Sequence, residues 1–142
     1  KAVNTADSMI GHKNKRYQDF GWASARFDDL INLPASRLAG LLIVAASVLV
    51  KGASPANAWR AIRRDAKRHR SPNAGWPEAA MAGALDLQLA GPRIYGGVKV
   101  SEPMINGPGR AVAKSEDIDA GIAVFYGACT VMTGLVLAIA MI

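Results

Sequence analysis

The sequence has 142 residues and a formal net charge of +6, and 51% of its residues are hydrophobic although only 6% are aromatic. Aliphatic and small residues therefore supply most of the apolar surface, a balance that suits packed helices in a soluble or a membrane protein. The single cysteine, Cys129, excludes an internal disulfide, and its small neighbours favour a buried thiol over redox or zinc chemistry.

The first 50 residues contain a polar segment followed by an apolar one. Residues 1–32 are polar and mixed in charge, and we expect short helices and loops there. An apolar run covers residues 33–50, in which Pro34 suits a first helical turn and Arg37 is the only charge. As a helix this run would extend about 27 Å, against about 30 Å for a hydrocarbon core. It is expected to span the membrane, to enter it and turn back, or to be a buried helix of a soluble protein.

A basic amphipathic helix is predicted next. Ser54 and Pro55 have the pattern of an N-cap followed by a first-turn proline. The stretch that follows has apolar residues on one helical face and basic residues on much of the remainder: Trp59, Ile62 and Ala66, against Arg60, Arg63, Arg64, Lys67, Arg68 and Arg70. Such a helix beside an apolar segment favours the anionic cytoplasmic surface of a bilayer, and a simple solvated face is an equal alternative.

Residues 71–78 contain the densest turn signals of the chain, with two prolines, a glycine and an asparagine around Trp76. We expect a rigid loop at this position. From Pro77 a helix rich in alanine and glycine is predicted to continue to near Gly91. Its small residues allow close approach of another helix or of a ligand, and helix packing is the favoured interpretation.

The last third of the chain is predicted to contain loops and then a membrane helix. Glycines and prolines over residues 93–114 predict the loops. Ser115 precedes an acidic helix start, and residues 118–142 contain only one charge, Asp119. This run is the strongest transmembrane prediction in the sequence. Residues 51–117 are expected to lie together in the cytoplasm.

General motifs do not identify a reaction. The sequence contains no Walker-type phosphate loop, Rossmann glycine fingerprint, metalloprotease helix or Gly-x-Ser-x-Gly elbow. His12 and His69 lack a second ligand at metal-binding spacing, so surface or hydrogen-bonding roles are favoured. Asp28 and Asp29 would point about 100° apart on a helix, which does not make an obvious acid–base pair. Either carboxylate could bind Mg²⁺ together with phosphate oxygens.

Three blocks of residues are more specific than these patterns. The first two are Asn4-Thr5-Ala6-Asp7-Ser8-Met9 and Ala25-Arg26-Phe27-Asp28-Asp29-Leu30, the latter followed by Asn32, Pro34, Ala35 and Arg37. The third is Arg64-Asp65-Ala66, His69 and then Ser71-Pro72-Asn73-Ala74-Gly75-Trp76-Pro77-Glu78-Ala79-Ala80-Met81-Ala82-Gly83-Ala84-Leu85. Together they resemble the adenosylcobinamide-phosphate synthase family over nearly the whole chain, which would correspond to about the C-terminal half of a family member.

The resemblance implies an all-α, multi-helix integral membrane protein of the cell (inner) membrane, with polar loops and an active face in the cytoplasm. It also implies an ATP-dependent ligation that joins adenosylcobyric acid to aminopropanol or its phosphate. ATP and Mg²⁺ are then the co-substrate and the metal, and the corrinoid is the substrate. Expected partners are the lipid bilayer and either other cobalamin-pathway enzymes or further copies of the chain, and nucleic acid is not expected.

This chemistry assigns roles to ten residues. The candidates for catalysis are Asp7, Asp28, Asp29 and Glu78, of which the three aspartates are also the candidates for holding Mg²⁺ and Glu78 the candidate acceptor of the amine proton. The candidates for substrate binding are Arg26, Arg37, Arg64, Ser71, Asn73 and Trp76. Arginine suits phosphate and carboxylate groups because its planar fork meets them bidentately.

The blocks at Asp7 and Asn73 should share the cytoplasmic face, because ATP and the corrinoid acid are cytoplasmic. We therefore predict that residues 33–50 enter the membrane and return, or cross only half of it. Two other functions stay open: a non-catalytic membrane subunit or transporter in corrinoid metabolism, and a soluble nucleic-acid binder that uses the arginines between Arg60 and Arg70. The apolar run ending at Ile142 argues against the soluble binder, because such a surface would aggregate in water.

Overall fold

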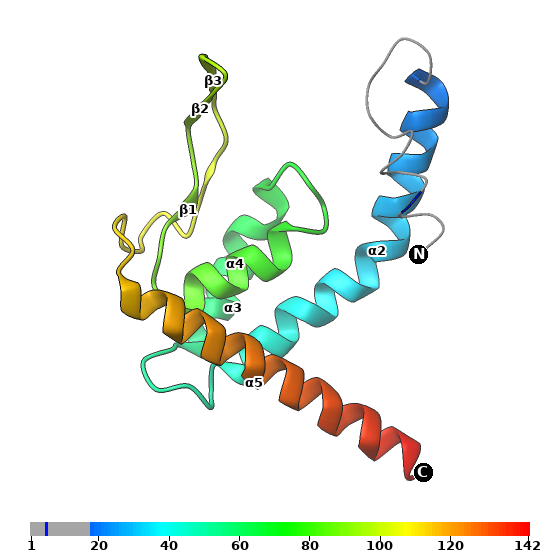
Figure 1. Cartoon of the computed structure of the whole chain (residues 1–142), viewed down its shortest axis with the longest axis vertical. Helices are drawn as coiled ribbons and strands as arrows, with labels where there is room; N and C mark the ends of the chain where they lie inside the picture. Colours follow the sequence, from blue (N-terminus) through cyan, green and yellow to red (C-terminus); the bar gives the residue numbers. More distant parts are fainter. Residues whose placement is uncertain (1–4, 6–17) are drawn as a thin grey trace. The chain divides into compact units, whose positions relative to one another are not determined.

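The computed structural model describes residue 5 and residues 18–142. The chain divides into two compact units, Lys1–Ala35 and Ser36–Ile142. The elements in chain order are α2 (Gln18–Ala46), α3 (Pro55–Asp65), the short 3-10 helix η1 (Ala66–Arg68), α4 (Gly75–Ala84), β1 (Leu89–Ala90), β2 (Arg93–Tyr95), β3 (Val98–Val100), β4 (Met104–Ile105) and α5 (Ser115–Ala140) (Figure 1). The described residues are mostly helical, as predicted, and they add four very short strands to the predicted all-α class.

Helix α2 is longer than the predicted apolar helix. It begins at Gln18, and Pro34, which was predicted for the first turn, lies inside it. A proline inside a helix lacks the N–H that would bond to the preceding turn. The turn before it has additional hydrogen bonds, because Asn32 Nδ2 donates to the main-chain oxygen and to Oδ2 of Asp28, both at 3.0 Å. The predictions of short helices and loops over residues 18–32 and of a helix start at the proline are therefore wrong.

Helices α3 and α4 pack closely at the centre of the second unit (Figure 1). Small residues allow this approach, since a Cβ added at Gly83 of α4 would lie 2.4 Å from the main-chain oxygen of Asn57 in α3. The hydrophobic residues buried around the contact are Ile43, Ala46, Ala58, Ala61, Ile62, Ala66, Ala79, Ala80, Ala82, Ile105 and Val124. The predicted close packing of the small-residue helix is confirmed.

Helix α4 ends earlier than predicted. Its last residue is Ala84, whereas the alanine- and glycine-rich pattern predicted an end near Gly91. The N–H of Leu87 donates to the main-chain oxygen of Ala82 at 2.9 Å, and Asp86 between them has a positive φ of 54°. This is the Schellman arrangement that satisfies the last carbonyl groups of a helix, with an aspartate in the left-handed position that glycine usually occupies.

The two other predicted helix starts are confirmed to within one residue. Ser54 caps α3, because its Oγ accepts the main-chain N–H of Asn57 at 3.2 Å. Helix α5 begins at Ser115, with Lys114 as the capping residue. The N–H of Lys114 donates to Asp117 Oδ2 at 2.7 Å, so an acidic side chain lies at the helix N-terminus, where the dipole favours negative charge.

Two short antiparallel ladders connect α4 to α5. Strand β1 pairs with β4, with Leu89 opposite Ile105. Strand β2 pairs with β3 through a turn at Gly96 and Gly97, whose φ angles of 54° and 81° are inexpensive for glycine. The prediction of loops over residues 93–114 missed the hairpin of β2 and β3, because strands of three residues are too short to show an alternating pattern.

Among the described residues, two helices are long and apolar enough to cross a membrane by length and composition. They are Ala25–Ala46, which is most of α2, and Ser115–Ala140, which is α5. Only 11% of the most apolar window of each helix is buried inside the structure, and Val124 is the single buried residue of α5. Most of their side chains therefore face outward, unlike those of a helix in the core of a soluble protein.

Candidate functional site

The segment at residues 71–78, here called the signature loop, carries four of the predicted site residues. Only residues 71–74 are a loop: α4 begins at Gly75, so the predicted loop ends earlier and the predicted helix begins two residues before Pro77. Ser71 fixes its turn, because its Oγ accepts the main-chain N–H of Asn73 at 3.3 Å and that of the next residue at the same distance. Gly75 lets the loop lie against the preceding turn, since a Cβ there would be 2.1 Å from the main-chain oxygen of Ala66. The hydroxyl of Ser71 and the absence of a side chain at Gly75 thus set the position of the loop.

Helix α2 supplies two polar side chains to the signature loop. Ser36 Oγ donates to Asn73 Oδ1 at 3.1 Å. Arg37 Nη1 donates to the main-chain oxygen of Pro72 at 3.1 Å and to Ser36 Oγ at 2.9 Å. The guanidinium carbon of Arg37 lies 5.2 Å from the centre of the Trp76 ring, within the range of a cation–π contact. The structure therefore brings together three predicted substrate-binding residues from two segments.

His69 connects Glu78 to the same loop. Its Nδ1 lies 3.0 Å from the nitrogen and 3.2 Å from the oxygen of the Ser71 main chain. Because a main-chain N–H can only donate, we assign Nδ1 as an acceptor, which puts the proton of the neutral ring on Nε2. Nε2, which carries the proton in this tautomer, lies 3.5 Å from Glu78 Oε2, so the imidazole is placed beside the carboxylate as a donor. The predicted hydrogen-bonding role of His69 is confirmed.

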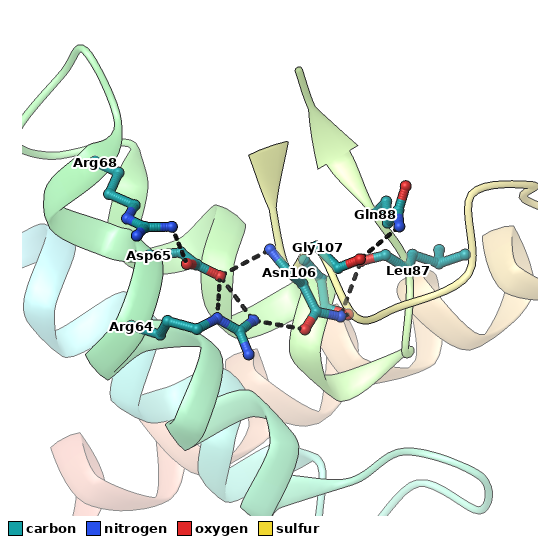
Figure 2. A network of polar contacts seen from close by, with 8 residues as sticks. Arg64, Asp65, Arg68, Leu87, Gln88, Asn106 and Gly107 are labelled. Carbon is teal, nitrogen blue, oxygen red and sulfur yellow. Dashed lines mark hydrogen bonds and ion pairs between the residues drawn. The ribbon is translucent and has the colours of Figure 1, made fainter. Parts of the chain in front are cut away.

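Arg64 lies in a separate polar network, which Figure 2 shows. Its Nε and Nη2 donate to Asp65 Oδ2 at 2.9 and 2.7 Å, and Nη2 also donates to Asn106 Oδ1 at 3.0 Å. The N–H of Asn106 donates to Asp65 Oδ2 at 2.9 Å. Its Nδ2 donates to the main-chain oxygens of Ala82 and Leu87. The network joins α3 to the end of α4 and to the residue after β4, and substrate binding by Arg64 stays a prediction.

Asp65 is a buried charge at the centre of this network, with 1% of its surface exposed. Burial by itself raises the pKa of a carboxyl group. The hydrogen bonds from Arg64 and from the Asn106 N–H, with the positive charges of Arg64 and Arg68, outweigh burial and hold the pKa of Asp65 below its usual range. The hydrogen bond to Asp65 likewise raises the pKa of Arg64. The ion pair therefore persists at neutral pH.

The remaining predicted residues lie towards the N-terminus. Asp28 and Asp29 are neighbours in α2, and Asp28 Oδ2 accepts a hydrogen bond from Asn32 at 3.0 Å. The guanidinium carbon of Arg26 lies 5.9 Å from the centre of a tryptophan ring on the same helix. In the part of the chain that the structure describes, no group of three or more His, Cys, Asp or Glu side chains could hold a metal. Asp7 lies outside the described residues.

Sequence reasoning did not assign roles to three residues that organise these contacts. Asp65 shares the buried face of α3 with Ala58 and Ile62, so a carboxylate on an apolar helical stripe was a usable signal. Ser36 and Asn106 gave no such signal, because their side-chain partners Asn73 and Arg64 are 37 and 42 positions away. Only the folded chain shows these pairs.

Comparisons with known proteins agree on one family. The model of the CobD/Cbib protein family matches residues 1–125. A cobalamin biosynthesis protein CobD from Sinorhizobium sp is 76% identical over 100% of this chain and 44% of its own length. Proteins of the same name are 66% identical in Rhizobium meliloti (strain 1021), over 94% of this chain and 41% of that protein, and 52% identical in Brucella anthropi, over 100% and 44%. The chain thus spans less than half the length of these relatives, and no solved structure matches it.

Proposed function

The chain belongs to the CobD/Cbib protein family, and we propose that it forms part of a cobalamin biosynthesis enzyme that makes an amide bond with ATP as co-substrate. The carboxylate of adenosylcobyric acid is first converted to an acyl phosphate by attack on the terminal phosphorus of ATP, which releases ADP. The amine of aminopropanol or its phosphate then attacks the acyl carbon, and inorganic phosphate and one proton leave. The product is adenosylcobinamide or its phosphate.

The observation that carries this proposal is the meeting of Arg37 with Asn73 and Trp76. The arginine comes from α2 and the other two from the signature loop, and all three belong to the blocks that carry the family resemblance. A guanidinium beside an amide and an aromatic face is suited to a substrate that combines carboxylate, amide and flat apolar groups. The site proposed for ligation is therefore the surface of the signature loop next to Arg37.

The two reacting groups need different help from these residues. Arg37 is proposed to orient the carboxylate or its acyl phosphate, whose negative charge a guanidinium can neutralise. Asn73 and Ser71 are proposed to bind the amide side chains of the corrinoid. Glu78 accepts the proton that the amine loses, and the Nε2–H of His69, 3.5 Å away, lies beside that carboxylate as a donor.

Asp28 and Asp29, with Asp7, are proposed to hold Mg²⁺. Two neighbouring carboxylates, one of them oriented by Asn32, offer the oxygen ligands that Mg²⁺ prefers. The ion would neutralise charge on the phosphates of ATP, from which it would also take ligand oxygens.

We further propose that α2 and α5 enter the cell (inner) membrane and that the signature loop faces the cytoplasm. The outward-facing apolar side chains of both helices support this placement. The basic residues that follow α2 in sequence also support it, because the anionic inner leaflet attracts such segments. ATP and the corrinoid acid then reach the loop from the same side.

The test is ligation by membranes that contain the complete protein. Membranes supplied with adenosylcobyric acid, aminopropanol phosphate, ATP and Mg²⁺ should form the cobinamide product, and leaving out ATP should abolish it. Absence of product from the intact protein under all these conditions would contradict the enzymatic proposal and favour a non-catalytic membrane subunit or transporter.

A further inference from the structure

A concave site lies at the residues that immediately precede the signature loop. It is an open pocket of about 280 Å³ between the turn after α3 and the segment that joins β3 to β4. Its lining residues are Arg68, His69, Arg70, Ala90, Val100, Ser101, Glu102 and Pro103. His69 therefore belongs both to this pocket and to the pair with Glu78.

The electrostatic balance of this pocket is positive. Arg70 is exposed, and among the side chains that the structure describes it has no hydrogen-bond or ion-pair partner. Arg68 Nη1 lies 3.5 Å from Asp65 Oδ1, a longer contact than the 2.7 Å between Arg64 Nη2 and the other oxygen of that carboxylate. The only acid in the lining is Glu102, and Arg93 is paired with it. Arg68 and Arg70 therefore add two positive charges to a lining whose single acid is already paired with Arg93.

We propose that this pocket is a phosphate-binding subsite in which Arg68 and Arg70 hold a phosphate group next to the His69 ring. Arginine donates two parallel hydrogen bonds to phosphate oxygens, and Ser101 adds a hydroxyl to the same lining. Pockets for drug-sized ligands measure about 300–1,000 Å³, so this pocket suits a small phosphate ester or one phosphate of a larger molecule. It is too small to enclose a corrinoid.

The subsite would bind the phosphate of one of the two phosphate-bearing substrates of the proposed ligation. To that extent it rests on the proposed function. The phosphate can come from a phosphorylated amino alcohol or from a nucleotide, because both present the same dianionic group. A ligand anchored here would lie within reach of Glu78 through the shared His69, whose Nε2 is 3.5 Å from that carboxylate.

The experiment measures ligand binding by calorimetry on the detergent-solubilised complete protein, without adenosylcobyric acid so that no ligation occurs. The probes are aminopropanol phosphate, aminopropanol as the matched ligand without phosphate, and ATP. Arg70→Gln should weaken binding of at least one phosphate-bearing probe by about tenfold, as expected for the loss of a charge-assisted hydrogen bond. Arg68→Lys, which keeps the charge but loses the fork, should weaken the same probe less.

The matched control is Arg63→Gln, which removes the same charge from an exposed position of α3 outside the pocket and should change affinity by less than about twofold. Weakened binding of aminopropanol phosphate alone would identify the amine as the source, and weakened binding of ATP the nucleotide. Unchanged affinity of Arg70→Gln for both probes, or no binding of either to the unaltered protein, would overturn the subsite. If Arg70→Gln weakens binding but the unaltered protein forms no product in the membrane ligation assay, the proposed function is contradicted and the subsite stands.

Discussion

Arg37 reaches the signature loop through a planar guanidinium that lysine cannot replace. Its Nη1 contacts the main-chain oxygen of Pro72 and Ser36 Oγ, and its face lies over the Trp76 ring. Arg37→Lys keeps the charge but loses this geometry, so we expect kcat/KM of ligation to fall about tenfold or more. Steady-state rates measured beside Arg63→Lys provide the comparison, and an Arg37→Lys enzyme with unaltered kcat/KM would exclude the assigned role.

Asp65 contributes to stability only while it is ionised. Because its pKa is lowered in the folded state, the contribution is fully present above the ordinary carboxyl pKa of about 3.9 and is lost as the pH falls through the lowered value. At pH 7, Asp65→Asn should reduce the free energy of unfolding by about 1–3 kcal/mol, since it replaces the charge-assisted hydrogen bonds from the partly exposed Arg64 with weaker neutral ones.

The pH dependence of the stability loss distinguishes a lost ion pair from poor packing of the new side chain, which would not depend on pH. The stability difference between the unaltered protein and Asp65→Asn should shrink below about pH 4 and disappear in stronger acid. Asp86→Asn is the control, because asparagine also accepts the positive φ at that exposed position and should cost less than about 0.5 kcal/mol. Denaturant unfolding at several pH values measures both, and a difference that stays constant from pH 7 to pH 3 would contradict the assigned ion pair.

Helices α3 and α4 hold the signature loop in place through a contact that only a small residue permits. Gly83→Ala would put a methyl carbon 2.4 Å from the main-chain oxygen of Asn57, so one helix must move. We expect a loss of about 1–3 kcal/mol and a lower thermal midpoint, as for other overpacked cores. Gly134→Ala in α5 has nothing within 4 Å and should be neutral. Equal midpoints for the two variants would show that the contact is not tight.

Helix α2 is long enough to cross a membrane, but the contact that Arg37 makes argues that it does not cross completely. Its apolar window Ala25–Ala46 has 22 residues and would extend about 33 Å, enough to cross a hydrocarbon core of about 30 Å. Arg37 lies within this window and contacts the polar loop at Pro72. A charge at the bilayer centre costs about 2.5–3.5 kcal/mol, so the contact favours a helix that enters the membrane only partly, which agrees with the proposed cytoplasmic site of ligation.

Cysteine labelling distinguishes the two topologies. In a Cys129→Ala background, Asn4→Cys and Lys67→Cys should both react with a membrane-impermeant maleimide only in inverted vesicles or permeabilised cells. Labelling of Asn4→Cys from outside and of Lys67→Cys from the cytoplasm would mean that α2 crosses the membrane, which contradicts the partial-entry proposal.

For the molecule as a whole, the sequence predicted those features that depend on neighbours along the chain. The cap at Ser54, the start at Ser115 and the packing of small residues such as Gly83 follow from local patterns and are confirmed. The predicted start of α2 was wrong, because a proline in an apolar run is equally compatible with the first turn of a helix and with a helix interior supported by Asn32.

The candidate site was predictable in composition but not in arrangement. The resemblance selected Arg37, Asn73 and Trp76, whose meeting depends on contacts across 35 or more positions. No local pattern could have separated Arg64, which lies in the Asp65 network, from Arg37, because both are arginines in blocks of the same resemblance. The basic pocket at Arg70 likewise depends on a distant segment, residues 100–103.

The most direct test of the account is the ligation rate of Asn73→Ala beside Asn57→Ala in the complete protein. Asn73 in the signature loop accepts the hydrogen bond from Ser36, whereas Asn57 belongs to the first turn of α3. The account predicts that Asn73→Ala loses at least about tenfold in kcat/KM for adenosylcobyric acid while Asn57→Ala retains the rate of the unaltered protein. Full ligation activity in Asn73→Ala would contradict the placement of the reaction at the signature loop.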